Sequence, residues 1–560
     1  MPALSLDFFM EYPVILPVVG LEVEQGYIRR HTQVDLMKGS VGVIFGETGS
    51  HTFRFAVTDP ADVKRTDYVK VWHEAAGWVL GQVLSMKRSS DVDNFDNAIM
   101  ANTGRFNGAD RDRIVALVSV IGARDSQGLL RTPMTPYRPG DKVYKAESDL
   151  IVDILGLSRG GAYIGLLDGT DIPVTVDRNK LIQKHCSILA MTGSGKSYTT
   201  AVIIEEMMEK EVPLLIIDPH GEYASLKYPN DDVDIETLAD KFDVDPEGFP
   251  NVTVYTPANK KLCEYADKVL RLNGINLSPK EIIEYVPSEL NNTELGLVYE
   301  AVNALKNDNI NNYTIKDVLN EISSSHSAMK WGVYNKLEPL INSEFLSDRP
   351  TPLPELFARG RVSIIDMKGI HPDVQQIIVA KLLANLFEDR KAGKVPAGMV
   401  VVEEAHNFCP EKGFMKTTSS DVLRTIASEG RKFGLGLLIV SQRPAKVDKN
   451  VLSQCNTQII MRVTNPNDIK AITKSLEGIS SELEEEIKRL PPGIAMFVSP
   501  DIPRAVMVQI RVRKSRHGGS AEEISDETEY EEEIVEEEPE EPEENNSRGG
   551  GLFSKLFGKR

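Results

Sequence analysis

The chain has 560 residues and the composition of an ordinary soluble protein, which leaves room for about two to four domains. No apolar run approaches the roughly 18 residues of a membrane span, and no basic stretch followed by an apolar one opens the chain, so we expect no membrane insertion. The cysteines stand apart without paired spacing, which argues against a zinc site and predicts a reducing, cytoplasmic setting; they are Cys186, Cys263, Cys409 and Cys455.

The net charge of −19 is unevenly placed along the chain. Glu522–Glu544 holds fifteen acids and no base, and Arg548–Arg560 holds four bases; with both set aside, the rest of the chain carries −8. A body of this charge argues against a protein coated in basic surface. It leaves room for a local basic channel, because nucleic-acid binding depends on where charges sit.

Residues 1–155 read as an all-β domain. Short β-rich runs recur between Gly, Pro and Asp punctuation with the spacing of a small barrel. The expected strands are Val41–Phe45, Thr52–Val57, Tyr68–Trp72, Val79–Met86, Ile114–Ile121, Val143–Tyr144 and Ile151–Leu155. The stretch Asp91–Arg113 is polar, and we expect a helical or mobile excursion there. No catalytic constellation is visible in this domain, so we expect a docking platform.

A phosphate-binding loop follows within residues 156–232. Ser187–Thr200 reads as an apolar strand, a glycine-broken turn and the start of an amphipathic helix. The glycines let backbone N–H groups approach phosphate oxygens, and the positive end of the helix dipole faces the phosphates. The lysine reaches the β- and γ-phosphates, and the serine hydroxyl can ligate Mg²⁺. Ala190 stands where the motif usually begins with Gly, a mild change. The predicted ATP-contacting set is Thr192, Gly193, Ser194, Gly195, Lys196, Ser197 and Tyr198.

The next strand, Leu214–Asp218, ends in a carboxylate that would face the nucleotide crevice of an open α/β sheet. Residues 233–360 change character: after a strand at Val252–Tyr255 they are mostly helical, with capping boxes at Ser278/Glu281 and Thr314/Asp317. We expect a helical subdomain inserted in the α/β core.

Residues 361–514 return to alternating strands and helices, which predicts a mostly parallel sheet covered on both faces. An amphipathic helix is expected at Val374–Arg390. The expected strands are Val362–Asp366, Met399–Val402, Leu437–Val440, Ile459–Val463, Ile494–Val498 and Val506–Val512.

Hydrolysis needs a metal carboxylate, a group for the attacking water and positive charge for the transition state. Glu403 and Glu404 end one strand; we assign Glu403 to Mg²⁺, in place of the usual Asp, and Glu404 to general base. Gln442, at the next strand end, is a candidate for the γ-phosphate or the water, unless it only bonds within its turn. Arg431 is the preferred source of positive charge, inserted into a neighbour's site, ahead of Arg424. The alternative for Arg431 is a residue that only caps its helix.

These motifs resemble the HerA branch of the HerA–FtsK ATPases. The matching strings are His185–Ser197, Asp218–Tyr223, Glu403–His406, Glu429–Lys432 and Ser441–Pro444, and the resemblance covers about Gly39 to Val512. It implies a RecA-like P-loop ATPase core with an N-terminal HAS-like barrel. It also implies a homohexameric, ATP-driven translocase or helicase on double-stranded DNA, working with a NurA-like nuclease in double-strand-break end resection.

Carried over residue by residue, the resemblance gives Lys196 and Ser197 phosphate and magnesium roles and lets Asp218 and Glu403 support the metal and water. Glu404 becomes the base and Arg431 the arginine supplied in trans. Relatives often carry Arg just before the strand histidine; this chain has Lys184, which cannot make the same forked nucleotide contact. Lys412 and Lys416 are weak candidates for DNA contacts, with a solvated loop as the alternative.

Residues 515–560 are expected to be a disordered acidic tail with an apolar end, Gly551–Arg560. That end either docks on a further partner or serves only solubility. Two rival functions stay open. One is a ring ATPase of a membrane-associated DNA or protein transfer system; the other is a non-motor nucleotide-dependent scaffold.

Overall fold

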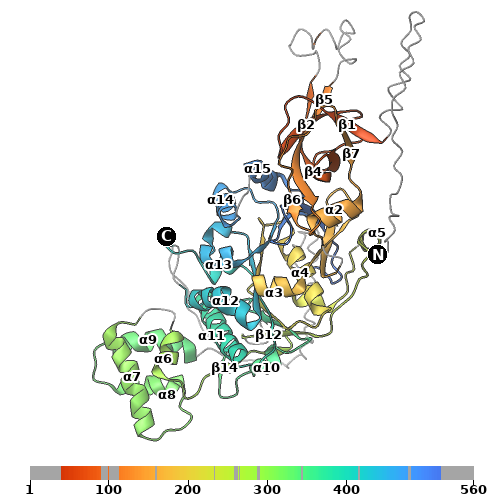
Figure 1. Cartoon of the computed structure of the whole chain (residues 1–560). Coiled ribbons are helices and arrows are strands. Elements are labelled where there is room, and N and C mark those ends of the chain that lie inside the picture. The colour runs from red at the N-terminus through yellow and green to blue at the C-terminus, as the bar shows by residue number, and fades with distance from the viewer. Residues whose placement is uncertain are drawn as a thin grey trace, which may run out of the picture. The chain divides into compact units, whose positions relative to one another are not determined.

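The computed structural model describes residues 39–89, 99, 113–157, 160–232, 234–257, 263, 265–286, 290–341, 345–413, 417–476 and 481–518 (Figure 1). Residues 1–38, most of the expected excursion at Asp91–Arg113 and the tail from residue 519, with its apolar end, lie outside the described residues. The described chain builds a small β-barrel, a large α/β sheet and a helical lobe.

The barrel is closed by antiparallel pairing in the order β2–β1–β7–β3–β4–β5, with β5 returning to β2. Its strands alternate apolar-in and polar-out: along β2, Phe53 and Phe55 are buried while Arg54 is exposed. The strands are β1 (Ser40–Ile44), β2 (Thr52–Val57), β3 (Tyr68–His73), β4 (Gly77–Ser89), β5 (Arg113–Arg124), β6 (Leu130–Arg131) and β7 (Lys142–Lys145). The expected barrel is therefore confirmed.

The strand expected at Ile151–Leu155 is wrong, because these residues form the end of helix α2 (Ser148–Leu155). Ile151, Ile154 and Leu155 are buried, a spacing that places them on one helical face. Gly156 ends the helix in the left-handed conformation. A run of only a few apolar residues can form either a buried strand or one face of a helix. The run is too short for its hydrophobic period to distinguish the two.

The large sheet has twelve strands in the order β13–β12–β16–β11–β17–β18–β10–β19–β20–β21–β8–β9. Pairing is parallel from β13 to β19 and antiparallel from β19 to β9, so the expected mostly parallel sheet is confirmed. Its strands are β8 (Ala162–Leu167), β9 (Pro173–Val176), β10 (Cys186–Leu189), β11 (Leu214–Asp218), β12 (Val252–Thr256), β13 (Lys268–Val269), β16 (Val362–Asp366), β17 (Gly398–Val402), β18 (Leu435–Ser441), β19 (Thr457–Ile460), β20 (Ile494–Val498) and β21 (Val506–Ile510).

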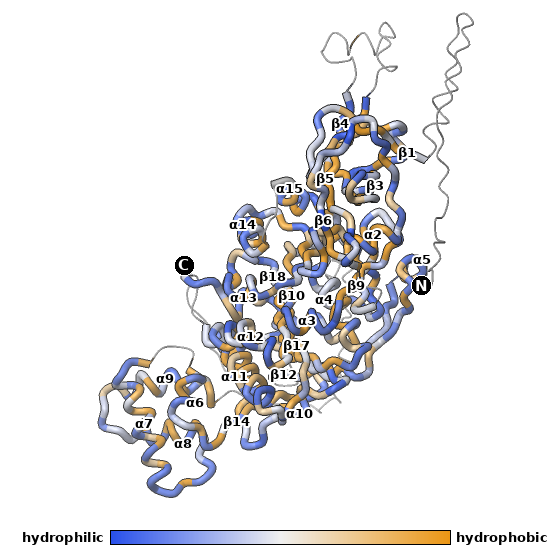
Figure 2. Tube along the Cα trace, in the orientation of Figure 1, coloured by the Kyte–Doolittle hydropathy of each residue, from blue (hydrophilic) through white to orange (hydrophobic). Residues whose placement is uncertain are grey.

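Both faces of this sheet are buried. Along β11, Leu214 and Ile216 belong to one hydrophobic core, and Leu215 and Ile217 to another on the opposite face. Figure 2 shows the central strands as hydrophobic. The helices of the α/β part are α3 (Arg178–Lys184), α4 (Lys196–Met208), α5 (Ile235–Phe242), α10 (Leu353–Leu356), α11 (Pro372–Lys391), α12 (Ser420–Phe433), α13 (Lys449–Gln454), α14 (Pro466–Ser475) and α15 (Ser481–Arg489).

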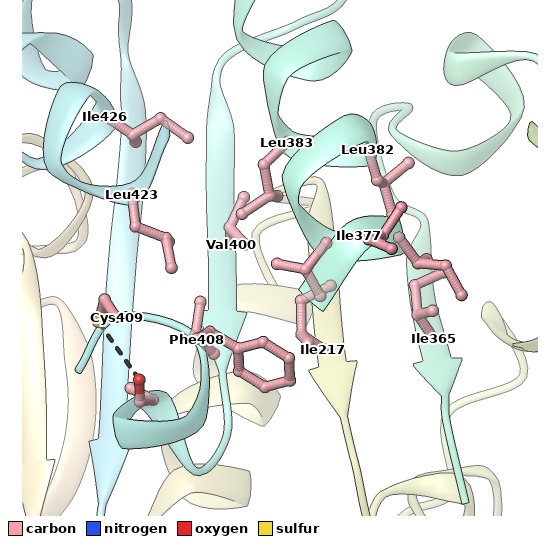
Figure 3. Packing of buried hydrophobic residues seen from close by; sticks show 14 of the residues in the cluster. Ile217, Ile365, Ile377, Leu382, Leu383, Val400, Phe408, Cys409, Leu423 and Ile426 are labelled. Atoms are coloured by element: carbon pink, nitrogen blue, oxygen red, sulfur yellow. Dashed lines mark hydrogen bonds between the residues drawn. The ribbon is translucent and has the colours of Figure 1, made fainter. Parts of the chain in front are cut away.

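Figure 3 shows how helix packing fixes the strand ends that matter below. Ile377 and Leu383 of α11 pack toward Ile217 of β11 and Val400 of β17, in the same core as Leu423 and Ile426 of α12. This apolar contact sets β11, β17 and β18 side by side, so the polar residues that follow them converge at one edge of the sheet.

The helical lobe comprises α6 (Pro279–Glu284), α7 (Asn292–Asn307), α8 (Ile315–Ser324) and α9 (Lys330–Ile341). Both expected capping boxes, at Ser278/Glu281 and Thr314/Asp317, are confirmed. The two-stranded ladder of β14 (Leu272–Asn273) and β15 (Leu346–Ser347) joins the chain on either side of the lobe. The lobe is thus shorter than the range 233–360, because β12 and β13 belong to the large sheet. Throughout the described part of the chain, every helix is too short or too polar to cross a membrane.

Candidate active site

The phosphate-binding loop joins β10 to α4 at the carboxyl edge of the parallel strands. Gly193 and Gly195 have φ values of 74° and 98°, which disfavour a side chain, and a Cβ at Gly193 would meet nothing within 4 Å. Gly195 is the N-cap residue of α4 and has no side chain that could bond to the first amides of the helix. These N–H groups therefore stay available to a ligand in the loop. Such a cradle of amides at a helix N-terminus fits phosphate groups.

Lys196, the first residue of α4, lies against both carboxylates that end β17. Its Nζ donates to Glu403 Oε2 at 2.6 Å and to Glu404 Oε1 at 3.1 Å. Burial alone would lower the pKa of Lys196, but the two carboxylates outweigh it and raise that pKa. The structure therefore brings together the lysine and the paired acids that the sequence analysis selected.

Glu404 is ionised and enclosed. Burial acts to raise its pKa, but His406 and Lys196 overcome burial and lower the pKa to about 2. Its Oε2 lies 3.1 Å from His406 Nδ1 and, among the described residues, receives no aligned hydrogen bond. A buried carboxylate oxygen left in this state is a fitting acceptor for a water molecule.

Ser197 faces an acid that the sequence analysis missed. Its hydroxyl donates to Glu222 in the loop after β11, and the hydroxyl of Tyr223 donates to Glu403. Carboxylates and a serine hydroxyl are the oxygen ligands that Mg²⁺ takes, so Ser197, Glu222 and Glu403 fit this ion. The signal was present in the string Asp218–Tyr223, whose second carboxylate received no role.

The Asp218 carboxylate is engaged within its own loop, and its expected support of the metal and water stays a prediction. Its carboxylate accepts the backbone N–H groups of His220, Gly221 and Tyr223. Burial, with the neighbouring Asp366 carboxylate, raises its pKa to about 7. Asp218 therefore shapes the loop that carries Glu222 and Tyr223.

Gln442 follows β18 directly and reaches the phosphate loop, where Thr192 donates to its side-chain oxygen. Parallel pairing of β10 with β18 places Leu189 opposite Ser441, and this register brings the two loops together. Gln442 thus lies beside the phosphate loop, and its contact with the γ-phosphate or the attacking water stays a prediction.

Arg431 and Lys184 lie at the other edge of the sheet. Arg431 is in the last turn of α12, before β18 begins, and Lys184 ends α3, before β10 begins. β18 has seven residues and spans about 20 Å at 3.3 Å per residue. Arg431 therefore cannot reach its own phosphate loop. Lys184 is separated from that loop by the four residues of β10, and its contact with nucleotide stays a prediction.

The two candidate arginines differ in their surroundings. Arg424 is engaged by the buried Asp448, 2.8 Å away, and by Asp421 at 3.1 Å. Arg431 is exposed. Arg424 is tied into the fold by these pairs, whereas the Arg431 side chain lies at the surface.

His185 ties Arg431's helix to the sheet. Its Nδ1 accepts the Leu437 N–H at 2.9 Å, so Nε2 carries the proton and donates to the Ala427 carbonyl at 3.0 Å. Its backbone is held at a φ of 51°, rare for a residue with a side chain. Burial lowers the pKa of His185 to about 4.

The chain after β21 packs on the phosphate-loop helix. Arg511 forms completely buried ion pairs with Glu205 and Glu206 of α4, at 2.9 and 3.1 Å. Tyr198, predicted to contact nucleotide, accepts the Arg513 N–H on its hydroxyl, and its ring contacts that of His517. The ordered chain therefore continues to Gly518, beyond the expected start of the tail at residue 515.

Of the DNA candidates, Lys412 is exposed in the loop after β17, and Lys416 lies outside the described residues.

Two family models match parts of this chain. Residues 162–386 match the family model described as "Helicase HerA, central domain", and residues 41–122 match the HAS barrel domain. The chain is 27% identical to the DNA double-strand break repair helicase HerA of Pyrococcus furiosus, over 86% of this chain and 94% of that protein. It is 30% identical to the protein of the same name from Sulfurisphaera tokodaii, over 71% of this chain and 79% of that protein.

Among solved structures, VirB4 of Thermoanaerobacter pseudethanolicus aligns with 63% of this chain and 97% of that chain, at 15% identity and a TM-score of 0.44.

Proposed function

The chain belongs to the HerA helicase family, and from this premise we propose that it is an ATP-driven translocase or helicase on double-stranded DNA. It acts as a homohexamer with a NurA-like nuclease in double-strand-break end resection. The observation that carries the proposal is the meeting of Lys196, Glu403, Glu404 and Gln442 at one edge of the sheet, with Arg431 at the opposite edge. Arg443 and Arg462 follow β18 and β19 at the edge of the phosphate loop, so the proposal assigns Arg431, at the opposite edge, to the site of a neighbouring subunit.

The resting contacts suggest how hydrolysis is triggered. Lys196 turns from the two carboxylates to the phosphates of ATP, which the amides at the start of α4 hold. Ser197, Glu222 and Glu403 would hold Mg²⁺, which when bound would neutralise charge at the phosphates. Once Lys196 leaves, one of the two side chains that lower the pKa of Glu404 is gone, so this pKa rises and Glu404 becomes a better base. Gln442 orients the attacking water.

Arg431 supplies the transition-state charge to the next subunit, and Lys184, at the same edge, faces that subunit's nucleotide. In other phosphate-loop enzymes a supplied arginine contributes roughly 10³–10⁵ in rate. The DNA backbone is held by sequence-independent charge contacts, for which Lys412 and Lys416 are candidates.

The test is ATP turnover with and without duplex DNA, run beside a native mass measurement. Duplex DNA should raise turnover of a six-subunit assembly. Lys196→Ala should nearly abolish turnover while the assembly persists. Unchanged turnover in Lys196→Ala would refute the nucleotide assignment, and turnover indifferent to DNA would favour a non-motor scaffold.

The barrel is the proposed docking platform for the nuclease. Trp72 and Trp78 pair across β3 and β4 and are 55% and 38% exposed, and aromatic residues of this kind dominate protein interfaces. Trp72→Ser should weaken capture of the nuclease in a pull-down. The matched control is Trp331→Ser, which removes a tryptophan of 57% exposure from the helical lobe. Equal capture by both variants would contradict this docking face.

A further inference from the structure

His406 lies between the proposed base and the end of β18. It is in the short 3-10 helix η5 (Ala405–Asn407), directly after Glu404. Its Nδ1 is 3.1 Å from Glu404 Oε2 and 3.2 Å from Ser441 Oγ, and its side chain is 12% exposed. A lone pair facing a carboxylate at this distance would be repulsive, so Nδ1 carries the proton. The imidazole therefore places an N–H beside Glu404 Oε2, close enough for charge attraction although not aligned as a hydrogen bond.

The backbone at Glu404 is in a strained conformation. Its φ and ψ are 46° and 47°, in the left-handed region that residues with a side chain seldom occupy. Residues held in this way collect at functional sites, where the surrounding structure must keep them in place. Here η5 is anchored by the buried Phe408 and Cys409, and the strained turn aims the Glu404 side chain back at the phosphate loop.

Two side chains contact Glu404, one at each carboxylate oxygen: Lys196 donates a hydrogen bond to Oε1, and His406 Nδ1 lies 3.1 Å from Oε2. The proposed mechanism removes the first contact, because Lys196 must turn to the phosphates. His406 is then the described side chain that still fixes the carboxylate.

His406 also connects Glu404 to the residue that meets the phosphate loop. Ser441, which lies against the imidazole, accepts the Arg443 N–H at 3.0 Å and immediately precedes Gln442. Gln442 in turn receives the Thr192 hydroxyl. A shift of Gln442 on nucleotide binding would thus reach Glu404 through Ser441 and the imidazole.

We propose that His406 is a positioning residue: it holds Glu404 in the orientation that accepts a proton from the attacking water, and it couples that orientation to Gln442. This inference rests on the proposed ATP hydrolysis. It assigns no contact between His406 and the nucleotide, so the predicted loss falls on kcat, with ATP affinity preserved.

The test compares two substitutions in the full chain. His406→Leu keeps similar volume but removes the donor, and His406→Asn keeps an amide N–H near the position of Nδ1. His406→Leu should lower kcat by roughly 10–100-fold, the cost of a misplaced catalytic group, with less than about twofold change in ATP affinity. His406→Asn should regain most of the loss. His326→Leu, at an exposed histidine of the helical lobe, serves as the control.

Full turnover in His406→Leu would overturn the inference. So would equal losses in the Leu and Asn variants accompanied by a lower melting temperature, which would indicate a purely structural side chain. Glu404→Gln, measured in parallel, separates this inference from the proposed function. If Glu404→Gln turns over ATP normally, the base assignment fails; if it is inactive and His406→Leu is fully active, only the role of His406 fails.

Discussion

Lys196 and Glu403 form a buried ion pair, with Nζ 2.6 Å from the carboxylate oxygen. The side chains are 10% and 3% exposed, so the pair is shielded from solvent. The lysine that would bind phosphate is thus held by the acids that would serve metal and water. ATP must compete with these acids for the lysine, which links occupation of the site to release of its carboxylates.

The paired carboxylates should separate in function. Glu404→Gln should bind ATP and Mg²⁺ but hydrolyse ATP slowly, with losses on the order of 10² or more, because the amide cannot accept the proton. Glu403→Gln should instead weaken the dependence on Mg²⁺. Steady-state turnover across a Mg²⁺ titration measures both. If Glu403→Gln alone stopped turnover, the two roles would be reversed.

Arg431 should act across the subunit interface. Arg431→Ala subunits should assemble and bind ATP but fail to hydrolyse it, since the transition state loses its charge partner. Mixed with Glu404→Gln subunits, they should regain ATPase activity wherever an intact base meets an intact arginine. Native mass confirms the mixed rings. Mixed rings without any activity would count against this assignment and leave Arg424, despite its in-chain partners, as the next candidate.

Arg511 should be a major source of stability for the C-terminal segment. Arg511→Ala removes a buried guanidinium shared by Glu205 and Glu206. Among the described residues, Glu205 then keeps the cation Arg513 at 3.9 Å and Glu206 keeps Arg178 at 3.0 Å. The loss should lower the free energy of unfolding by about 3 kcal/mol, the lower end for a broken buried pair. Arg516→Ala is the matched control, because its partner Asp231 and its own side chain are exposed, and exposed pairs contribute about 0–1 kcal/mol. Chemical denaturation measures both. A loss in Arg511→Ala no larger than in Arg516→Ala would show that the network is not stabilising.

His185 should make stability fall in mild acid. Its folded pKa of about 4 lies below the value of 6.5 for an unburied histidine, so between these values the unfolded chain binds a proton that the folded chain does not. The contribution of His185 to the free energy of unfolding is therefore fully present above pH 6.5. It falls by about 3 kcal/mol as the pH decreases to 4.

The variant His185→Asn isolates this contribution. Its unfolding free energy should be lower overall, but its decline between pH 7 and pH 4 should be shallower than in the natural chain by about the same 3 kcal/mol. Parallel pH slopes in the two proteins would show that His185 does not titrate in this way.

The position of the candidate site could be predicted from the sequence because its residues follow directly after parallel strands. The bounds of β11 and β16 were predicted correctly. Each is a short, mostly apolar run that ends in a polar residue, and in a chain of alternating strands and helices such a run indicates a buried strand. The chemical groups at the ends of β10, β17 and β18 then had to share one edge. Local pattern was therefore enough to bring Lys196, Glu403 and Gln442 together.

What the sequence could not predict depended on direction and distance. Asp218 and Glu222 are both acids of one loop, and only the hydrogen bonds of that loop decide which faces Ser197. The last two strands of the sheet, β8 and the edge strand β9, carry short runs whose partners lie in β21 and in each other, so nothing local marked them as part of the sheet. Lys184 stood near the phosphate loop in the chain but at the far end of β10.

The pairing of β8 with β21 has a consequence for synthesis on the ribosome. The barrel strands end at Lys145, so the barrel can close early, whereas β8 waits for residues Val506–Ile510 to emerge. Arg511 and the segment that covers Tyr198 come later still. Because domains fold as they are made, a nascent chain stalled before this point would expose a completed docking barrel beside an ATPase sheet lacking its last strands. On the proposed function, such a chain would bind the nuclease without hydrolysing ATP, so release of the full chain would be the step that joins binding to motion.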